Sequence, residues 1–131
     1  MIVVDTSAVL TALVASQPDE ALLGRIEDEE LHVPHLIDVE ALHALRRMVK
    51  TGLLDEWRAV EVQKDFADLA LLRYPHHRLA DRIWELRHTL TAYGAAFVAL
   101  SEVLGAPLVT CDRRLASASG HGAAVEVFGA A

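Results

Sequence analysis

The sequence predicts an α/β fold in which helices cover both faces of a short, mostly parallel central sheet. Short apolar runs alternate along the chain with longer segments of helical periodicity, a pattern typical of strand–helix–strand units. The first run, residues 2–4, is continuously hydrophobic, as strands buried on both faces are. The length of 131 residues is that of one domain, so we expect residues 1–131 to form a single one.

The elements can be assigned in order from these patterns. Strands are expected at residues 1–5, 31–33, 69–74, 108–110 and 125–128, and helices at 8–15, 18–27, 36–50, 55–67, 79–87, 92–104 and from 113 onward. Thr6 or Ser7 is expected to cap the first helix, and Thr91 the helix at 92–104. Pro18 is expected to open the second helix, and Pro34 to end the second strand. Residues 75–77 are expected to form a loop.

Apolar side chains at helical spacing mark the faces expected to be buried. On the helix at 36–50, a stripe of Leu42, Leu45, Met48 and Val49 is expected to face the core. Trp57 and Trp84 also fall on helices, where we expect them to lie in the core or against a partner chain.

Charge and cysteine content limit the function classes. The formal net charge of −7 argues against nucleic-acid binding through a broadly basic surface. Residues 1–40 hold nine acids and one base, whereas the remainder is nearly balanced and contains nine of the ten arginines. The single Cys111 forms no intramolecular disulfide, which fits a reducing, cytoplasmic location. We expect no membrane association, because no apolar run approaches the ~20 residues of a spanning helix.

Three acids stand where an α/β sheet binds ligands. Asp5 and Asp112 each come at the end of a predicted strand, and Glu40 lies early in the helix after the second strand. In such folds ligands bind beyond the carboxyl ends of the strands. Carboxylates gathered there repel one another unless a hard cation, Mg²⁺ or Mn²⁺, lies between them. Taken singly, Asp5 and Asp112 are more simply explained as helix caps.

Four segments, in order, are similar to motifs of PIN-domain ribonucleases of the VapC toxin type. They are residues 2–10 (IVVDTSAVL), 33–47 (VPHLIDVEALHALRR), 90–100 (LTAYGAAFVAL) and 108–115 (LVTCDRRL). The resemblance implies a three-layer α/β/α PIN-like fold and a metal-dependent endoribonuclease that cuts single-stranded RNA, such as loops of tRNA or rRNA. It also implies a homodimer and a VapB-type antitoxin as partner. Asp5, Glu40 and Asp112 match the family's catalytic and metal-binding acids.

One position departs from the family pattern. The remaining acid of the family, directly after the tyrosine of the third motif, is replaced here by Gly94. Glycine supplies no ligand, so the resemblance implies a weakened or inactive nuclease. Glu102 is not expected to substitute, since eight residues along a helix span about 12 Å.

Polar residues beside the acids carry less specific expectations. Thr6, Ser7 and Thr110 are candidates to bind substrate or metal-bound water, with helix or turn capping as the alternative. Arg87 resembles a recurrent family arginine that approaches phosphate, with a surface ion pair as the alternative. The arginine pairs at 46–47 and 113–114 are candidates to follow an RNA backbone, although such pairs usually face solvent.

Two further functions remain open on the sequence. The first is a non-catalytic PIN module that binds antitoxin or RNA. The second is a phosphatase of the haloacid-dehalogenase class, whose first motif also follows a hydrophobic strand. That chemistry needs a second aspartate two residues after Asp5, where this chain has Ser7.

Overall fold

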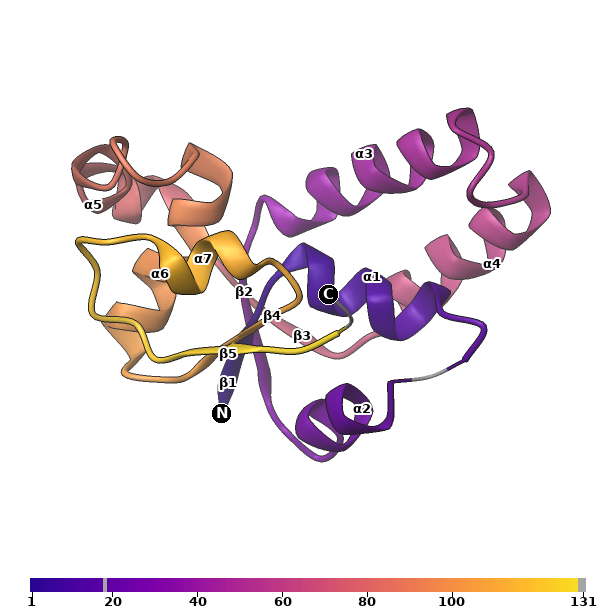
Figure 1. The fold of residues 1–131 in the computed structure, drawn as a ribbon, viewed down its shortest axis with the longest axis horizontal. Helices are drawn as coiled ribbons and strands as arrows, with labels where there is room; N and C mark the ends of the chain where they lie inside the picture. The colour runs from indigo at the N-terminus through magenta and orange to yellow at the C-terminus, as the bar shows by residue number, and fades with distance from the viewer. Residues whose placement is uncertain (18, 130–131) are drawn as a thin grey trace.

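A five-stranded parallel sheet forms the centre of the structure, a computed structural model that describes residues 1–17 and 19–129 (Figure 1). The strands are β1 (Ile2–Val4), β2 (Leu31–Pro34), β3 (Leu71–Tyr74), β4 (Leu108–Thr110) and β5 (Val125–Val127), in the spatial order β3-β2-β1-β4-β5. Val3 pairs with His32 on one side and Leu108 on the other, and all four strand pairs are parallel. The predicted sheet is confirmed, and its carboxyl ends share one edge.

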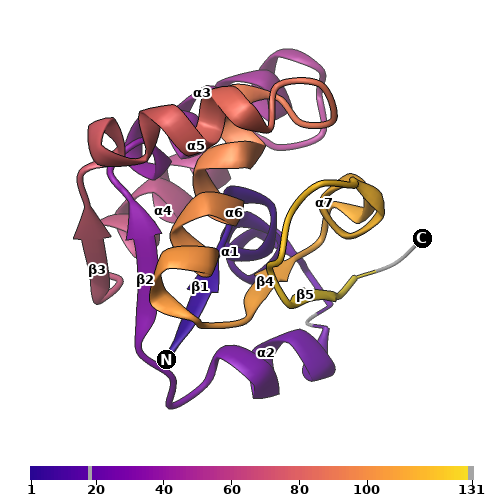
Figure 2. The ribbon, with the colours of Figure 1, turned by 90° about the vertical axis from the view of Figure 1, so that its left-hand side faces the viewer.

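Helices cover both faces of this sheet. They are α1 (Thr6–Val14), α2 (Glu20–Ile26), α3 (Ile37–Lys50), α4 (Glu56–Ala67), α5 (Ala80–Glu85), α6 (Ala92–Leu104) and α7 (Arg113–Ser117). Helix α6 packs on β1, β2 and β4, and Figure 2 shows it in front of the sheet with α1 behind. Helices α3 and α4 extend from the body as an antiparallel pair (Figure 1). This is the predicted three-layer α/β/α fold.

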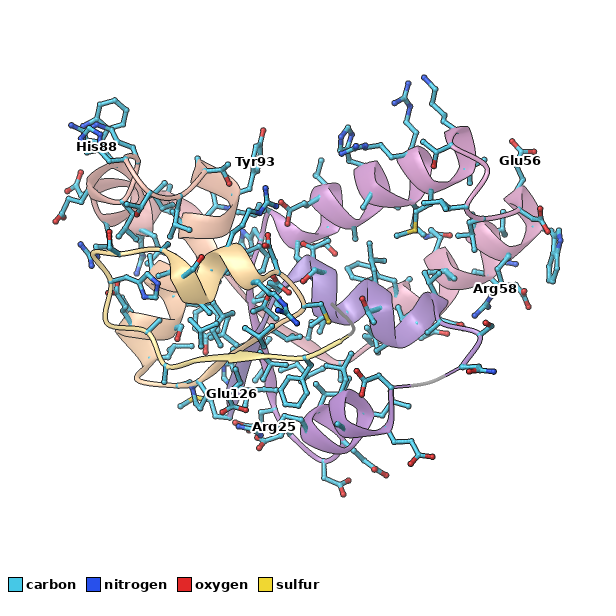
Figure 3. The ribbon with its side chains drawn as sticks, viewed as in Figure 1. Arg25, Glu56, Arg58, His88, Tyr93 and Glu126 are labelled. Carbon is cyan, nitrogen blue, oxygen red and sulfur yellow. The ribbon has the colours of Figure 1, made fainter. Side chains whose placement is uncertain are left out.

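The core lies between the sheet and α6. Residues 95–101 of α6 are all buried, and Phe97 is the largest of the fully buried side chains. Six of its thirteen residues are Ala, Gly or Ser, and small side chains of this kind allow it to approach β1 closely. Gly105 then ends α6 in the left-handed conformation, with φ 63°. On the opposite side, Arg25 of α2 binds Glu126 of β5, with Nε 2.7 Å from Oε1 (Figure 3).

Several boundaries differ from those predicted. Helix α1 begins at Thr6 because Asp5, rather than Thr6 or Ser7, accepts the free N–H of Ala8 as the cap. The second strand ends at Pro34 as predicted, although Pro34 is itself its last paired residue, opposite Tyr74. The second helix is capped by Asp19. Pro18, its predicted first residue, lies outside the described residues.

The region around α5 also differs. Residues 76–79, partly assigned to a loop, form a 3₁₀ turn (His76–Leu79) that leads directly into α5. The helix predicted at 79–87 is α5, which is shorter at Ala80–Glu85.

The predicted buried face of α3 is only partly correct. Leu45 is buried, but Leu42 is 50% exposed, and Ile37 and Ala41 take the inner positions instead. Helix α3 packs against both α1 and α4, and its buried residues are Ile37, Ala41 and Leu45. Trp57 and Trp84 are each 66% exposed, so of the two predicted roles the core position is wrong, and contact with a partner chain stays a prediction. Within the described ranges, every helix falls short of the length and hydrophobicity that a membrane crossing requires.

Candidate active site at the carboxyl edge of the sheet

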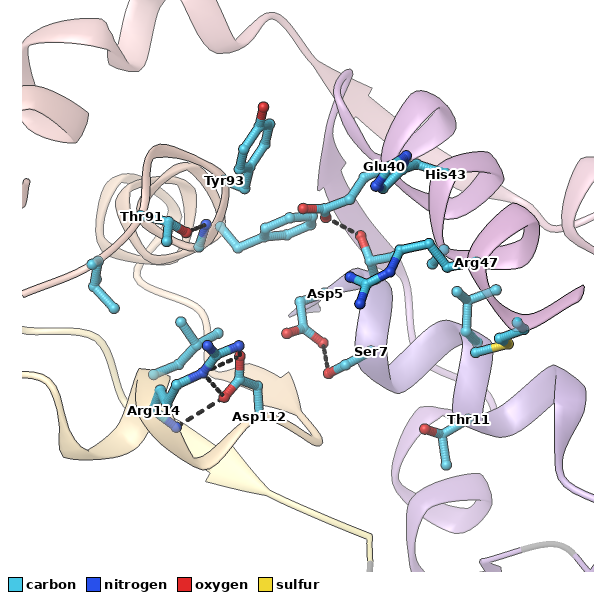
Figure 4. A pocket seen from close by; sticks show the side chains of 18 of the residues that line it. Asp5, Ser7, Thr11, Glu40, His43, Arg47, Thr91, Tyr93, Asp112 and Arg114 are labelled. Atoms are coloured by element: carbon cyan, nitrogen blue, oxygen red, sulfur yellow. Dashed lines mark hydrogen bonds and ion pairs between the residues drawn. The ribbon is translucent and has the colours of Figure 1, made fainter. Parts of the chain in front are cut away.

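Asp5, Glu40 and Asp112 line one cavity of about 850 Å³ at the carboxyl edge of the sheet (Figure 4). Asp5 follows β1 directly, and Asp112 lies two residues beyond the end of β4, the neighbouring strand. Glu40 lies in the first turn of α3, which follows β2 on the other side of β1. The parallel arrangement of three adjacent strands therefore brings together acids that are far apart in sequence.

Asp5 is the most deeply placed of the three, with 6% of its surface exposed. Thr110 Oγ1 donates to its Oδ2 at 2.6 Å, and Ser7 Oγ and the Ala8 N–H donate to its Oδ1 at 2.7 and 3.0 Å. Burial raises the pKa of Asp5, and the negative charge of Asp112 adds to the increase, while the hydrogen bonds oppose it. The carboxylate is rigidly oriented and lacks a compensating cation among the described residues.

Glu40 is oriented by the residue next to Asp5. The Thr6 hydroxyl donates a hydrogen bond to Glu40 Oε1 across the start of the two helices. The Thr6 side chain is buried, and that of Glu40 is half-buried. Thr6 and Ser7 thus hold two different acids through adjacent hydroxyl groups.

Asp112 is bound by a cation from its own helix. Its carboxylate accepts hydrogen bonds from Arg114 Nε at 3.0 Å and Arg114 Nη2 at 2.8 Å, and it caps α7 by accepting the Arg114 N–H. The bonded guanidinium lowers the pKa of Asp112. The Asp112 N–H donates to Thr110 Oγ1 at 2.9 Å, so Thr110 links Asp112 to Asp5.

Both strand-end acids are therefore helix caps as well as cavity residues. The cap explanation is correct for Asp5 and for Asp112, since each accepts a backbone N–H at the start of a helix. Each nevertheless keeps carboxylate surface toward the same cavity. The two interpretations are compatible, because a cap uses only one of the lone-pair directions of a carboxylate.

Gly94 lies in the wall of the cavity, at the third position of α6. Thr91 caps this helix as predicted, with its Oγ1 accepting the Gly94 N–H at 3.2 Å. A Cβ at Gly94 would lie 2.9 Å from Leu115 Cδ2 and 3.6 Å from Thr91 Oγ1. The space beside Gly94 is thus partly filled by a side chain of α7.

The three acids do not form a closed cation cage. Over residues 1–17 and 19–129, no three His, Cys, Asp or Glu side chains are grouped closely enough to hold a metal ion. They line one cavity, but Thr6 holds Glu40 and Arg114 holds Asp112, each with its own partner. Their oxygen chemistry fits Mg²⁺ or Mn²⁺, and binding would require the carboxylates to turn toward one another.

Other candidates lie outside this cavity. Arg87 lines a neighbouring cavity of about 310 Å³, where its guanidinium stacks 4.4 Å from the centre of the Trp84 ring. Glu102 is not in the acidic cavity, because Arg82 binds both of its carboxylate oxygens at 2.8 and 2.9 Å.

The sequence analysis missed two residues that line the cavity. Neither His43 nor Tyr93 is among the predicted site residues, yet both line it. His43 lies three residues after Glu40 on α3, so helical spacing alone would have placed both on one face. Tyr93 is 64% exposed at the start of α6 and points away from the body (Figure 3).

Comparisons with known proteins agree with the geometry. The family model of the PIN domain matches residues 2–120. Ribonuclease VapC12 of Mycobacterium tuberculosis is 37% identical over 127 residues, covering 97% of this chain and 98% of the relative. Ribonuclease VapC9 of the same organism is 45% identical over 118 residues and covers 88% of each.

A solved structure supports the fold. The crystal structure of Mycobacterium tuberculosis VapC20, described as a sarcin-ricin loop cleaving toxin, superposes with a TM-score of 0.67. The match covers 89% of this chain and 94% of VapC20 at 16% sequence identity. At that identity the likeness concerns the three-layer architecture alone.

Proposed function

The chain belongs to the PIN domain family, among the VapC ribonucleases, and from this membership we propose that it is the toxin of a type II toxin–antitoxin pair. Its activity in this proposal is the internal cleavage of single-stranded RNA, with loops of tRNA or rRNA as the substrate class. The observation that supports it is the shared cavity of Asp5, Glu40 and Asp112 at the carboxyl edge of β2, β1 and β4.

The proposal includes Mg²⁺ or Mn²⁺ held by Asp5, Glu40 and Asp112. Asp5 supports this part, because its carboxylate is buried next to another acid and its pKa is raised. A hard cation between such carboxylates removes both the desolvation cost and the repulsion. When bound, an ion of this kind activates water and stabilises the charge on a phosphate.

The neighbouring hydroxyl groups position the acids in this proposal. Thr110 and Ser7 hold Asp5, and Thr6 holds Glu40, so that both carboxylates stay at the same cavity until a metal ion draws them together. Thr6 and Ser7 line the cavity and are proposed to contact substrate or bound water. Thr110, the third hydroxyl predicted for this role, is fully buried and outside the cavity lining, and it acts through its hydrogen bonds to Asp5 and Asp112. Arg87 lies beyond the cavity, so any contact it makes with RNA involves nucleotides outside the cleavage site.

A non-catalytic PIN module is the second candidate function. Two observations favour it: Gly94 contributes no carboxylate, and the guanidinium of Arg114 already occupies Asp112. In this alternative the cavity binds RNA or antitoxin without turnover. The haloacid-dehalogenase alternative has no support, since Ser7 replaces the required acid and the match to the PIN domain spans residues 2–120.

Two measurements on the same preparation separate these candidates. Calorimetric titration with Mn²⁺ reports binding, and cleavage of an end-labelled single-stranded RNA reports turnover. A nuclease binds Mn²⁺ and cleaves, and the Asp5→Asn variant loses both. If the chain is a non-catalytic module, the unmodified chain and the Asp5→Asn variant give the same result in the cleavage assay, whether that is no cleavage or the same background products.

The partners proposed with this function are a VapB-type antitoxin and a second copy of the chain. Exposed apolar side chains on α3, α4 and α5 support an interaction surface of some kind, because large exposed apolar groups are typical of interfaces. They are Val39, Leu42, Trp57, Val60 and Trp84.

A further inference from the structure

Two arginines enter the acidic cavity from different helices. Arg47 comes from α3 and Arg114 from α7, and Figure 4 shows them on opposite sides of Asp5. Their sequence neighbours, Arg46 and Arg113, do not line the cavity. The sequence presents two arginine pairs, and the structure places one member of each in the cavity.

The phase of α3 explains the selection of Arg47. The residues of α3 that line the cavity are Glu40, His43, Ala44, Arg47 and Met48. Their spacing of three and four residues is that of a single helix face. Arg46 is rotated by about 100° from Arg47 around the helix axis and points to solvent. Arg47 therefore shares a face with a candidate catalytic acid, seven residues and two turns away.

Both guanidinium groups have donors available for a ligand. Arg47 makes no ion pair or side-chain hydrogen bond with any residue that the structure describes. Arg114 uses Nε and Nη2 to hold Asp112, and its Nη1 has no partner in the described ranges. Because a guanidinium carries five N–H donors, Asp112 orients the group of Arg114 and leaves several donors unused.

The unused donors of the two guanidinium groups, and not the net charge of the cavity, favour an anion beside them. Three carboxylates face two guanidiniums, and Gly94 adds no further negative charge. Arginine binds phosphate through paired hydrogen bonds in a fixed fork geometry. Tyr93, exposed beside the cavity, adds an aromatic face of the type on which unpaired bases stack.

We propose that Arg47 and Arg114 bind the backbone phosphates of single-stranded RNA on the two sides of the acids, and that this contact needs no metal ion. The inference rests on the proposed function for its substrate class. Beyond the proposed function, this inference names Arg47 and Arg114 as the residues that hold the RNA, although the overall charge of −7 on the chain repels it.

The test measures RNA binding without metal. A fluorescein-labelled single-stranded RNA of mixed sequence is titrated with the full chain in EDTA at several NaCl concentrations, with fluorescence anisotropy as the readout. We expect Arg47→Gln and Arg114→Gln each to weaken binding roughly two- to fivefold, the range of an exposed ion pair. Each should also lower the slope of log affinity against log salt by about 0.7, the value for one lost phosphate contact on a single strand.

The chain contains its own matched controls. Arg46→Gln and Arg113→Gln remove the same charge one residue away, outside the cavity, and should leave the salt slope unchanged. Equal effects of all four substitutions would overturn the proposal, as would the absence of RNA binding by the unmodified chain in EDTA. If Arg114→Gln fails to fold, as judged by circular dichroism, Arg47→Gln decides the outcome, because Arg47 is exposed and bonded to no other side chain.

Cleavage in Mn²⁺ is measured on the same variants to separate the two proposals. RNA binding that depends on Arg47 and Arg114, without any cleavage, contradicts the nuclease but supports this inference. Cleavage together with RNA binding that is insensitive to both arginines contradicts this inference alone.

Discussion

A terminal methyl group of Leu115 lies 2.9 Å from the position that a Cβ would take on Gly94. Leu115 is 4% exposed and lies on α7, three residues after Asp112. A side chain at position 94 must therefore displace this methyl group, which is the flexible end of a side chain on the helix that Asp112 caps.

The contact with Leu115 has to be controlled for when an acid is restored at position 94 and Mn²⁺ affinity and RNA cleavage are measured. We expect Gly94→Asp to tighten Mn²⁺ binding about tenfold. Removing a group that supports a metal site typically weakens affinity by about 10- to 100-fold, and the expected gain is the reverse of the smaller of these effects. RNA cleavage should rise with it. Gly94→Asn is the matched control, since it displaces Leu115 equally but adds no charge. Calorimetry and a cleavage assay on both variants check the prediction, and an Asn variant as active as the Asp variant would contradict the role of the charge.

The Leu115 contact has its own signature in stability. A helix interior normally gains about 0.5–1 kcal/mol when glycine is replaced by alanine. For Gly94→Ala we expect no such gain, because the added methyl group must push Leu115 out of its packed position. Thermal denaturation of this variant checks the prediction. Gly24→Ala is the control, since Gly24 lies within α2 with open space around its Cβ position, and it should show the usual increase in Tm.

Asp5 predicts a pH dependence whose sign follows from its raised pKa. In the folded chain Asp5 binds its proton more tightly than in the unfolded chain, so ionisation of this group opposes folding as the pH rises above 3.8. Asp5→Asn keeps the shape and the cap without the buried charge. In EDTA we expect this variant to be at least as stable as the parent at pH 7, with the difference shrinking as the pH falls toward 3.8. Melting curves across this range provide the check, alongside complete loss of RNA cleavage.

Thr6 provides a test of how Glu40 is positioned. Thr6→Val keeps the shape of the side chain but removes the hydroxyl that donates to Glu40. We expect Mn²⁺ affinity and cleavage to fall roughly tenfold, as is typical when a residue that orients a metal ligand is lost. Thr11→Val makes the same chemical change on the same helix, where the hydroxyl contacts none of the three acids. Equal losses in both variants would point to a general effect on α1 rather than to Glu40.

The two tryptophans report whether a partner covers α4 or α5. Trp57 and Trp84 are each 66% exposed, so the isolated chain should show the long-wavelength fluorescence of solvated indole. We expect a blue shift at concentrations where sedimentation shows a dimer, because an interface desolvates one of the rings. Trp57→Phe and Trp84→Phe then identify which ring is buried. A dimer without any blue shift would place the interface elsewhere.

The sequence by itself determined the layers of the fold and the positions of the acids along the chain. Local patterns are sufficient for this, because a short apolar run followed by a polar residue and a helical segment specifies a strand end and a helix start. Asp5 and Asp112 were identified in this way, and parallel strand order then required them to meet. The four motifs identified the family for the same reason, since each lies within a continuous segment.

Helix phase and side-chain contacts across the cavity were decided by the tertiary structure alone. Which arginine of each pair faces the cavity depends on how α3 and α7 are rotated against the sheet, and neither rotation is encoded in the pair itself. The predicted apolar stripe on α3 failed at Leu42 for this reason, because the face that is buried is the one of Ile37, Ala41 and Leu45. The contact between Leu115 and Gly94 joins two helices whose approach is fixed by packing. The local sequence around Leu115 does not indicate that its side chain fills the space left by the missing Cβ of Gly94.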